Sequence, residues 1–311
     1  MQPDDLEEMN RIFAEAFTAS YHRDGLPAVR IPPLSPAFLA LERQVSGEGA
    51  FVAEQRGRLT GFVFARAHGS EGWFGPLAVD PSRQRQGIGK ALVGRAVDYL
   101  KEAGCRTIGL ETMPRTYVNL GLYTGLGFRP GHLVMTCQVE IPVQIPKVRG
   151  HGGAFLLSQL HDDERRALHP HLVGFWNQLA PGLDYTATVH ATLGAGFGDA
   201  LVVQDKGEVV GFLHFHHSRY FVTDGPGVLR IARVAARRDT NAFPILMAAL
   251  ADYGIDHGMD ELYIRCQSSD WEVTQMLLSW GFRITHTDLR MHLDGYPEPP
   301  TPEHVHMTRW G

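Results

Sequence analysis

The residues best suited to chemistry lie in a short loop, Gln84-Arg85-Gln86-Gly87-Ile88-Gly89, between an apolar strand and a long helix. The strand ends at Leu77-Ala78-Val79, and Asp80-Pro81-Ser82 breaks it because proline cannot donate to a sheet. The helix that begins at Ile88 offers unpaired amides and the positive end of its dipole, and Lys90 adds a fixed cation. This arrangement predicts a site for a phosphate ester.

Two common phosphate-binding motifs do not fit this loop. The ATP-binding P-loop requires Gly-x4-Gly-Lys-Ser/Thr, but Gly89-Lys90 is followed by Ala91, and Gln84 holds the first glycine position. The dinucleotide fingerprint requires a small residue where Leu92 stands, and an acidic residue further on, for which Glu111 is the candidate. The order of elements is also not that of a βαβ unit, so we expect a different phosphate ester.

The loop resembles the acyl-CoA site of the GNAT superfamily of N-acetyltransferases. That family has the pattern Arg/Gln-x-x-Gly-x-Gly/Ala after a strand that ends Leu-x-Val-x-Pro. Six residues match the two patterns: Gln84, Gly87 and Gly89 in the loop, and Leu77, Val79 and Pro81 in the strand. Residues 122–128, LYTGLGF, are similar to the family's Leu-Tyr-x-x-x-Gly-Phe segment and follow the loop at the family's spacing.

The resemblance implies transfer of an acetyl group from acetyl-CoA to an amine. It assigns the binding of acetyl-CoA to Leu77, Ala78, Val79, Gln84, Arg85, Gln86, Gly87, Ile88, Gly89, Lys90 and Asn119. Tyr123 is the implied general acid that protonates the departing thiolate. An alkyl amine must lose a proton before it attacks. Glu71, before the central strand, and Glu111, at the end of the next strand, are the two candidates for the general base.

Apolar periodicity indicates the elements that position these residues. Helical spacing predicts helices over 4–20 and 36–45, and strands are predicted at 51–54, 61–65, 107–110 and 132–139. The chain has 311 residues, more than one hydrophobic core usually supports, which favours two domains. The predicted fold class is α/β (α+β), with two tandem GNAT-like domains, each a mixed, mostly antiparallel sheet flanked by helices.

The second half of the chain repeats the first. A shift of 150 residues carries Val52, Gly57, Gly61 and Phe62 onto identical residues, and a shift of 154 does so for six residues between 98 and 129. Such matches indicate an internal duplication. We expect a catalytic domain over 1–143, a linker within 141–153, a second GNAT-like domain over 144–294 and a C-terminal tail over 295–311.

The second copy has lost the residues that the chemistry requires. The shift of 154 places Asn241 and Phe243 at the two glycine positions of the loop, and Leu277 at the tyrosine position. Phe243 puts a ring where phosphates would approach the backbone, and the next residue, Pro244, removes an amide donor. Leucine cannot donate a proton, so the second domain is predicted to be degenerate.

Composition narrows the partners and the setting. The net charge of −5 gives no footprint for nucleic acid or an anionic membrane, and the three cysteines lack metal-type or redox-type spacing. We expect a cytoplasmic protein without a metal that acetylates a small-molecule amine or a peptide amine. The sequence does not indicate the oligomeric state. The alternative is a non-catalytic acyl-CoA-binding or protein-interaction module, which would not need Tyr123.

Overall fold

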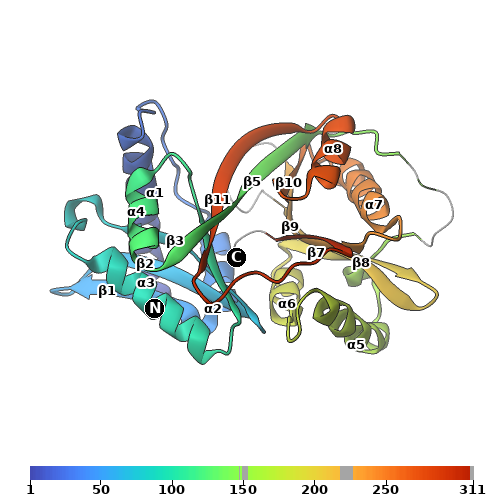
Figure 1. The fold of residues 1–311 in the computed structure, drawn as a ribbon, viewed down its shortest axis with the longest axis horizontal. Helices are drawn as coiled ribbons and strands as arrows, with labels where there is room; N and C mark the ends of the chain where they lie inside the picture. Colours follow the sequence, from blue (N-terminus) through green and yellow to red (C-terminus); the bar gives the residue numbers. More distant parts are fainter. Residues whose placement is uncertain (147, 149–152, 218–226, 309–311) are drawn as a thin grey trace.

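The computed structural model describes residues 1–146, 148, 153–217 and 227–308, and the order of helices and strands in its first half recurs in the second, which adds β6 at its start and β12 at its end (Figure 1). The first half contains α1 (Leu6–Arg23), α2 (Pro36–Ser46), β1 (Ala50–Gln55), β2 (Arg58–His68), β3 (Glu71–Val79), α3 (Ile88–Glu102), β4 (Thr107–Thr112), α4 (Tyr117–Gly125) and β5 (Phe128–Glu140). The second half contains β6 (Phe155–Leu156), α5 (Asp162–Leu179), α6 (Thr186–Gly194), β7 (Gly198–Asp205), β8 (Glu208–His217), β9 (Val228–Arg237), α7 (Ala242–Asp256), β10 (Glu261–Gln267), α8 (Trp271–Ser279), β11 (Arg283–Leu293) and β12 (His304–Thr308). Short 3-10 helices lie at Pro3–Asp5, Gly47–Gly49, Pro81–Arg83 and Leu157–Gln159.

The predicted fold class is confirmed: the sheet is mixed, mostly antiparallel and flanked by helices. The predicted helices correspond to α1 and α2, and each predicted strand has its counterpart among β1, β2, β4 and β5. The strand predicted from 132 begins earlier, at Phe128, because the chain is already extended after the turn at Gly127, whose φ is 88°.

The internal duplication is visible in the strand register. In the hairpin of β1 and β2, Val52 pairs with Phe62, and in that of β7 and β8, Val202 pairs with Phe212. Both hairpins have a register shift one residue later along the first strand. The helices α3 and α7 also begin and end at positions that the shift of 154 connects. Two copies of one local structure therefore follow each other in the chain.

The two copies share one continuous sheet because they exchange their last long strands. The strand order is β1-β2-β3-β4-β11-β5-β10-β9-β8-β7-β6. Strand β11 of the second half lies between β4 and β5, and residues 134–140 of β5 pair with β10. Figure 1 shows β5 and β11 crossing together between the two halves. A boundary at residue 143 therefore separates the sequence repeats but not the sheet.

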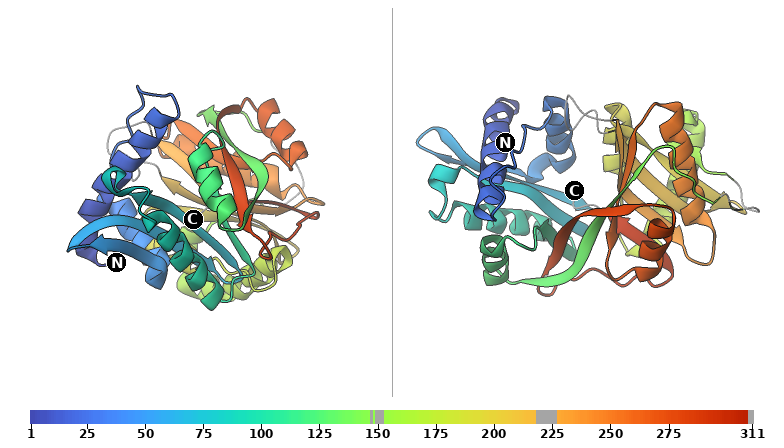
Figure 2. Two further views of the ribbon diagram at one scale, coloured as in Figure 1. Left: turned by 60° about the vertical axis from the view of Figure 1, so that its left-hand side comes forward. Right: turned by 90° about the horizontal axis from the view of Figure 1, so that it is seen from above.

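Helices cover both faces of this sheet, as the alternation of side chains along β2 requires. Phe62 and Phe64 pack with α1 and α2 on one face, whereas Val63 and Ala65 pack with α3 on the other. Figure 2 (right) shows the blue helices and the teal helix on opposite sides of the strands. The second half repeats this pattern, with α5 and α6 on one face and α7 and α8 on the other.

The end of the chain is not a simple tail. Residues 304–308 form β12, which pairs antiparallel with β9, and Val305 and Met307 are buried in the core of the second half. Alternating apolar residues in this short segment find an open strand edge, which explains why it joins the sheet. The last three residues of the predicted tail, 309–311, lie outside the described residues. The predicted linker is also partly packed, since Ile145 is buried in the same core.

Candidate active site

The candidate site lies where the parallel strands β3 and β4 separate. They pair only over three positions, from Glu71 with Thr107 to Trp73 with Gly109. Beyond Trp73, β3 carries a bulge, because Gly75 and Pro76 lie opposite a single residue of β2. The bulge leaves the ends of β3 and β4 apart, and both cavities described below open into this gap.

A buried arginine holds the bulge in place. Arg66, only 1% exposed, donates one hydrogen bond to the Gly75 carbonyl and forms an ion pair with Glu42 of α2. A buried guanidinium group is costly to desolvate unless such partners compensate it. The bulge is therefore fixed by a side chain that reaches it from the neighbouring strand.

We name the first cavity the cofactor cleft; its volume is about 460 Å³ and it is bounded by the end of β3, the loop before α3, and α1 and α4. Ten of the predicted acetyl-CoA residues line it: Leu77, Ala78, Val79, Gln84, Arg85, Gly87, Ile88, Gly89, Lys90 and Asn119. Gln86 is not among the lining residues. The lining also includes Arg23 of α1, a cation that the sequence analysis did not single out.

The loop has the backbone conformation of an anion site. Arg85 and Gly87 both have positive φ, 63° and 83°, and Gly87 is the residue that precedes α3. Such alternation turns successive amide N–H groups toward a common point. The side-chain amide of Gln84 donates to the Val79 carbonyl over 3.2 Å, which ties the loop to the end of β3. The amides at the start of α3 are thus directed into the cleft.

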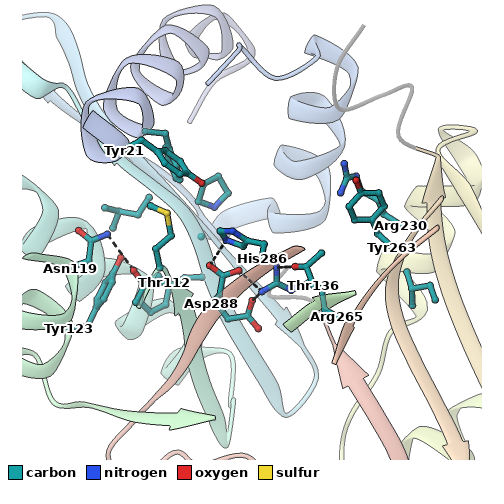
Figure 3. A pocket seen from close by; sticks show the side chains of 18 residues that line it. Tyr21, Thr112, Asn119, Tyr123, Thr136, Arg230, Tyr263, Arg265, His286 and Asp288 are labelled. Carbon is teal, nitrogen blue, oxygen red and sulfur yellow. Dashed lines mark hydrogen bonds and ion pairs between the residues drawn. The ribbon is translucent and has the colours of Figure 1, made fainter. Parts of the chain in front are cut away.

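The second cavity, which we name the acceptor pocket, has a volume of about 270 Å³ and lies on the other side of the gap. It shares Phe17, Leu77, Met113 and Asn119 with the cofactor cleft, so the two cavities meet at these side chains. Its walls come from both halves of the chain (Figure 3). The second half contributes the side chains Arg230, Ile231, Tyr263, Arg265, His286 and Asp288.

Tyr123 lines the acceptor pocket from α4, beside Asn119. Its ring packs edge-on against Phe74 and Phe128, and burial raises the pKa of its hydroxyl to about 12. The hydroxyl therefore keeps its proton throughout the neutral range. No hydrogen bond of this hydroxyl is found within the described part of the chain. The geometry leaves it available to a group that enters the gap.

The two predicted bases differ in position. Glu71 lies at the start of β3, and its Oε2 accepts a 2.7 Å hydrogen bond from the Tyr185 hydroxyl. It lines neither cavity, and at about 3.3 Å per residue it is roughly 20 Å from Leu77. The structure thus does not bring Glu71 together with the other candidates.

Glu111 does line the acceptor pocket, but its two oxygens are occupied. One accepts from Arg265 at 2.5 Å and the other from Arg290 at 2.8 Å, and the side chain is fully buried. Both oxygens of this carboxylate are therefore engaged in ion pairs with guanidinium groups. The shift of 154 residues that relates the two copies carries position 111 onto position 265. Glu111 and Arg265, which form this ion pair, therefore occupy equivalent positions in the two copies.

The sequence analysis missed a pair of groups on β11, His286 and Asp288. His286 Nε2 lies 3.3 Å from Asp288 Oδ1, and the His286 side chain is 39% exposed. Burial raises the pKa of Asp288, but the hydrogen bonds and charges of His286 and Arg265 outweigh it and lower that pKa. Asp288 is therefore ionised at neutral pH. Both residues belong to β11, a strand of the second half that pairs with β4 of the first half. No local sequence pattern indicates this pairing.

In the second copy, the equivalent gap is filled by protein. Strand β8 occupies one edge of β9, and β10 pairs with the other edge only from Val228 to Arg230. Beyond that point β12 pairs with Arg233–Arg237, so it occupies the place that corresponds to the cofactor cleft. Phe243 is buried and stacks on Trp280, between α7 and α8. Asn241, which precedes α7, has an ordinary φ of −93° in place of the positive φ of Gly87.

Within the described residues, no three or more His, Cys, Asp or Glu side chains gather where they could hold a metal ion. His214 and His216 are buried on β8, and both contact Thr192. None of the described helices is both long enough and apolar enough to cross a membrane.

Comparison with known sequences finds relatives of the first half of the chain. Residues 6–128 match the Acetyltransferase (GNAT) family. The [Ribosomal protein bS18]-alanine N-acetyltransferase of Escherichia coli (strain K12) is 35% identical over 78 residues, which are 25% of this chain and 53% of the relative. Mycothiol acetyltransferase of Amycolatopsis mediterranei (strain U-32) is 36% identical over 90 residues, 26% of this chain and 30% of the relative. The chain thus spans about half or less of the length of these relatives.

Solved structures match the whole chain. A GCN5-related N-acetyltransferase from Sphaerobacter thermophilus has a TM-score of 0.61 at 15% identity, covering 96% of this chain and 95% of that protein. A tandem GNAT protein from the clavulanic acid biosynthesis pathway has a TM-score of 0.60 at 13% identity, covering 96% and 98%. At such low identity, the likeness concerns the fold.

Proposed function

Since residues 6–128 belong to the acetyltransferase (GNAT) family and the whole chain has a tandem GNAT fold, we propose that this protein is an acetyl-CoA-dependent N-acetyltransferase. The observation that carries the proposal is the meeting of the cofactor cleft and the acceptor pocket at the gap between β3 and β4. A thioester at this junction would be reached from the acceptor side by an amine. The first copy performs the reaction in this proposal.

The cofactor cleft supplies the groups that a CoA ester needs. The amides at the start of α3, with Arg83, Arg85 and Lys90 at the rim, suit its pyrophosphate. The end of β3, from Leu77 to Val79, suits the pantetheine arm and provides amides for the oxyanion. In the second copy β12 takes this place on β9, which supports our proposal that residues 144–294 form a degenerate domain.

The reaction balances with groups at the junction. The amine nitrogen attacks the thioester carbonyl carbon, so a C–N bond forms and the C–S bond breaks. The amine loses one proton to a base, and the sulfur gains one from the Tyr123 hydroxyl. Although the pKa of Tyr123 is about 12, a thiolate in the same buried gap is also a stronger base than in water, because burial disfavours its charge.

We assign the base to His286, positioned by Asp288. A neutral imidazole can accept a proton, and the Asp288 carboxylate, whose Oδ1 lies 3.3 Å from His286 Nε2, orients the ring. This assignment replaces Glu71 and Glu111. It predicts that His286→Gln lowers kcat, while the affinity for acetyl-CoA stays the same.

The acceptor is either a small-molecule amine or a peptide amine. The relatives include an enzyme named for a ribosomal-protein alanine and an enzyme named for mycothiol. The pocket volume of about 270 Å³ favours a small molecule or the first residue of a peptide. We also propose that the protein acts in the cytoplasm.

The proposal is tested by an acceptor screen that follows the release of CoA thiol and identifies the acetylated product by mass spectrometry. We expect at least one primary amine to be acetylated, with one acetyl group transferred per CoA released. If acetyl-CoA binds and no small or peptide amine is ever acetylated, the protein is a non-catalytic acyl-CoA-binding module and the proposal is wrong.

A further inference from the structure

The charged side chains of the acceptor pocket are unevenly distributed along its length. In the view of Figure 3, Asn119 and Tyr123 lie at one end, and Arg230 and Tyr263 lie at the other. The acidic groups gather between these ends, around Asp288. A ligand that extends from the thioester junction into the second half would therefore meet negative charge first and positive charge afterwards.

The charge around Asp288 sums to a negative value. Three carboxylates, Glu111, Asp288 and Glu298, share two guanidinium groups, those of Arg265 and Arg290. Glu298 is held by Arg290 alone at 2.6 Å, and Asp288 receives its second contact from His286. The excess negative charge, close to the proposed base, suits an acceptor amine in its protonated form as it enters.

The far end of the pocket has the opposite character. The Arg230 guanidinium is stacked over the Tyr263 ring, 4.6 Å from the ring centre, and lines the pocket. Burial lowers the pKa of Arg230, in spite of the nearby Tyr263 and Glu261, so its charged form is poorly solvated. The carboxylate of Glu261 accepts hydrogen bonds from Tyr263 and Gln138 and does not line the pocket. As a cation in the pocket wall, Arg230 gives this end of the pocket a positive charge that suits an anionic group of a ligand.

A second cation of the pocket wall has unused hydrogen-bonding capacity. Arg265 donates through its terminal nitrogens to Glu111, Asp288 and Thr136. Within the described residues, its buried Nε has no hydrogen-bond partner. A buried donor without a partner is unfavourable, and an oxygen of a bound ligand would satisfy it.

We propose that the acceptor carries an anionic group, a carboxylate or a phosphate, in addition to its amine. The amine lies beside His286 and Asp288, and the anionic group lies against Arg230 and Tyr263 of the second half. This inference rests on the proposed N-acetyltransferase function and adds the class of acceptor to it. The degenerate copy then has a role of its own, since it recognises the end of the acceptor that does not react.

The test compares matched acceptors that differ only in the charge of the distal group. It uses the full chain with acetyl-CoA and measures kcat/KM by CoA release. The acceptors are ω-amino acids of increasing chain length, their primary amides, the corresponding diamines and the aminoalkyl phosphates. We expect the best anionic acceptor to exceed its amide by about 10- to 100-fold, the range for a charge-assisted contact in a partly buried site. The ratio of carboxylate to phosphate acceptors identifies the anionic group.

Charge substitutions at the far end make the test specific. Arg230→Gln should reduce the preference for the anionic acceptor to less than about threefold, and Arg230→Glu should reverse it in favour of the diamine. The matched control is Arg283→Gln, an exposed arginine on β11 outside the acceptor pocket, which should keep the wild-type preference. A gain of activity with the diamine cannot result from misfolding.

The possible outcomes separate the inference from the proposed function. If neutral amines or diamines are acetylated as well as anionic ones, the inference is wrong while the N-acetyltransferase function stands. If anionic acceptors are preferred but Arg230→Glu leaves the preference unchanged, the inference is also wrong. If acetyl-CoA binds and no amine of any charge is acetylated, both proposals fail.

Discussion

Replacing Tyr123 by phenylalanine should slow acetyl transfer and leave the fold intact. The ring packs edge-on against Phe74 and Phe128, with centroid distances of 6.3 and 6.1 Å, and phenylalanine keeps these contacts. In the described part of the chain, the hydroxyl makes no hydrogen bond that would be lost. A substitution that conserves volume in this way changes the free energy of unfolding by less than about 1.5 kcal/mol.

The expected loss of rate follows from the role of the hydroxyl. Because its pKa is about 12, the phenol is protonated at every pH at which the enzyme would be assayed. A positioned general acid contributes about 100- to 10,000-fold, so kcat should fall by this factor, which corresponds to about 3–5 kcal/mol in the activation barrier. The dissociation constant of acetyl-CoA should change by less than about threefold, because the contact is made to the departing sulfur in the transition state.

The assay should isolate the chemical step. Single-turnover release of CoA thiol reports the acyl transfer, calorimetry reports the affinity for acetyl-CoA, and urea unfolding reports stability. Tyr99→Phe is the matched control, since Tyr99 packs on Phe51 and lies outside both cavities. A single-turnover rate within about threefold of wild type for Tyr123→Phe would refute the role of the hydroxyl.

Further predictions concern the cleft, the buried histidines and the bulge. Gly89→Phe, which copies the second repeat, should raise the dissociation constant of acetyl-CoA at least about 100-fold, as measured by calorimetry; unchanged affinity would place the ligand elsewhere. Arg233 donates hydrogen bonds to both His68 and His214, and burial lowers the pKa of each histidine well below 6.5. As the pH falls below 6.5, these histidines become protonated in the unfolded chain before they do in the folded protein. The free energy of unfolding should therefore decrease below pH 6.5. The slope should approach about 2.7 kcal/mol per pH unit for the two histidines and should halve in His214→Gln; a urea midpoint that is flat between pH 7 and 5 would contradict this. Arg66→Met should cost about 3–5 kcal/mol in stability, because it leaves a buried carboxylate without its partner; a loss under about 1 kcal/mol in urea unfolding would be inconsistent with the buried ion pair.

The sequence was sufficient for the cofactor cleft because its determinants are local. The conformation of Gly87, the turn before α3 and the end of β3 lie within a few residues of one another, and the pattern of residue types records them. The duplication could also be predicted, because identical residues at turns and helix ends keep the same spacing in both copies. The position of Gln86 outside the cleft is a detail that the pattern cannot give.

The acceptor pocket could not be predicted for a physical reason. Its walls depend on the exchange of β5 and β11, which brings together residues separated by more than 100 positions, such as Glu111 and Arg265. Glu71 was a plausible base by its chemistry, but its place at the start of β3 put it at the wrong end of the strand. The strand β12 was read as a tail because a five-residue strand has too little pattern to reveal its partner.

The central claim is that one copy binds acetyl-CoA while the other has its corresponding place filled by β12 and Phe243. Calorimetric titration of the full chain with acetyl-CoA tests it most directly. We expect one binding site per chain, which disappears in Gly89→Phe. Two sites per chain, or one site that persists unchanged in that variant, would contradict it.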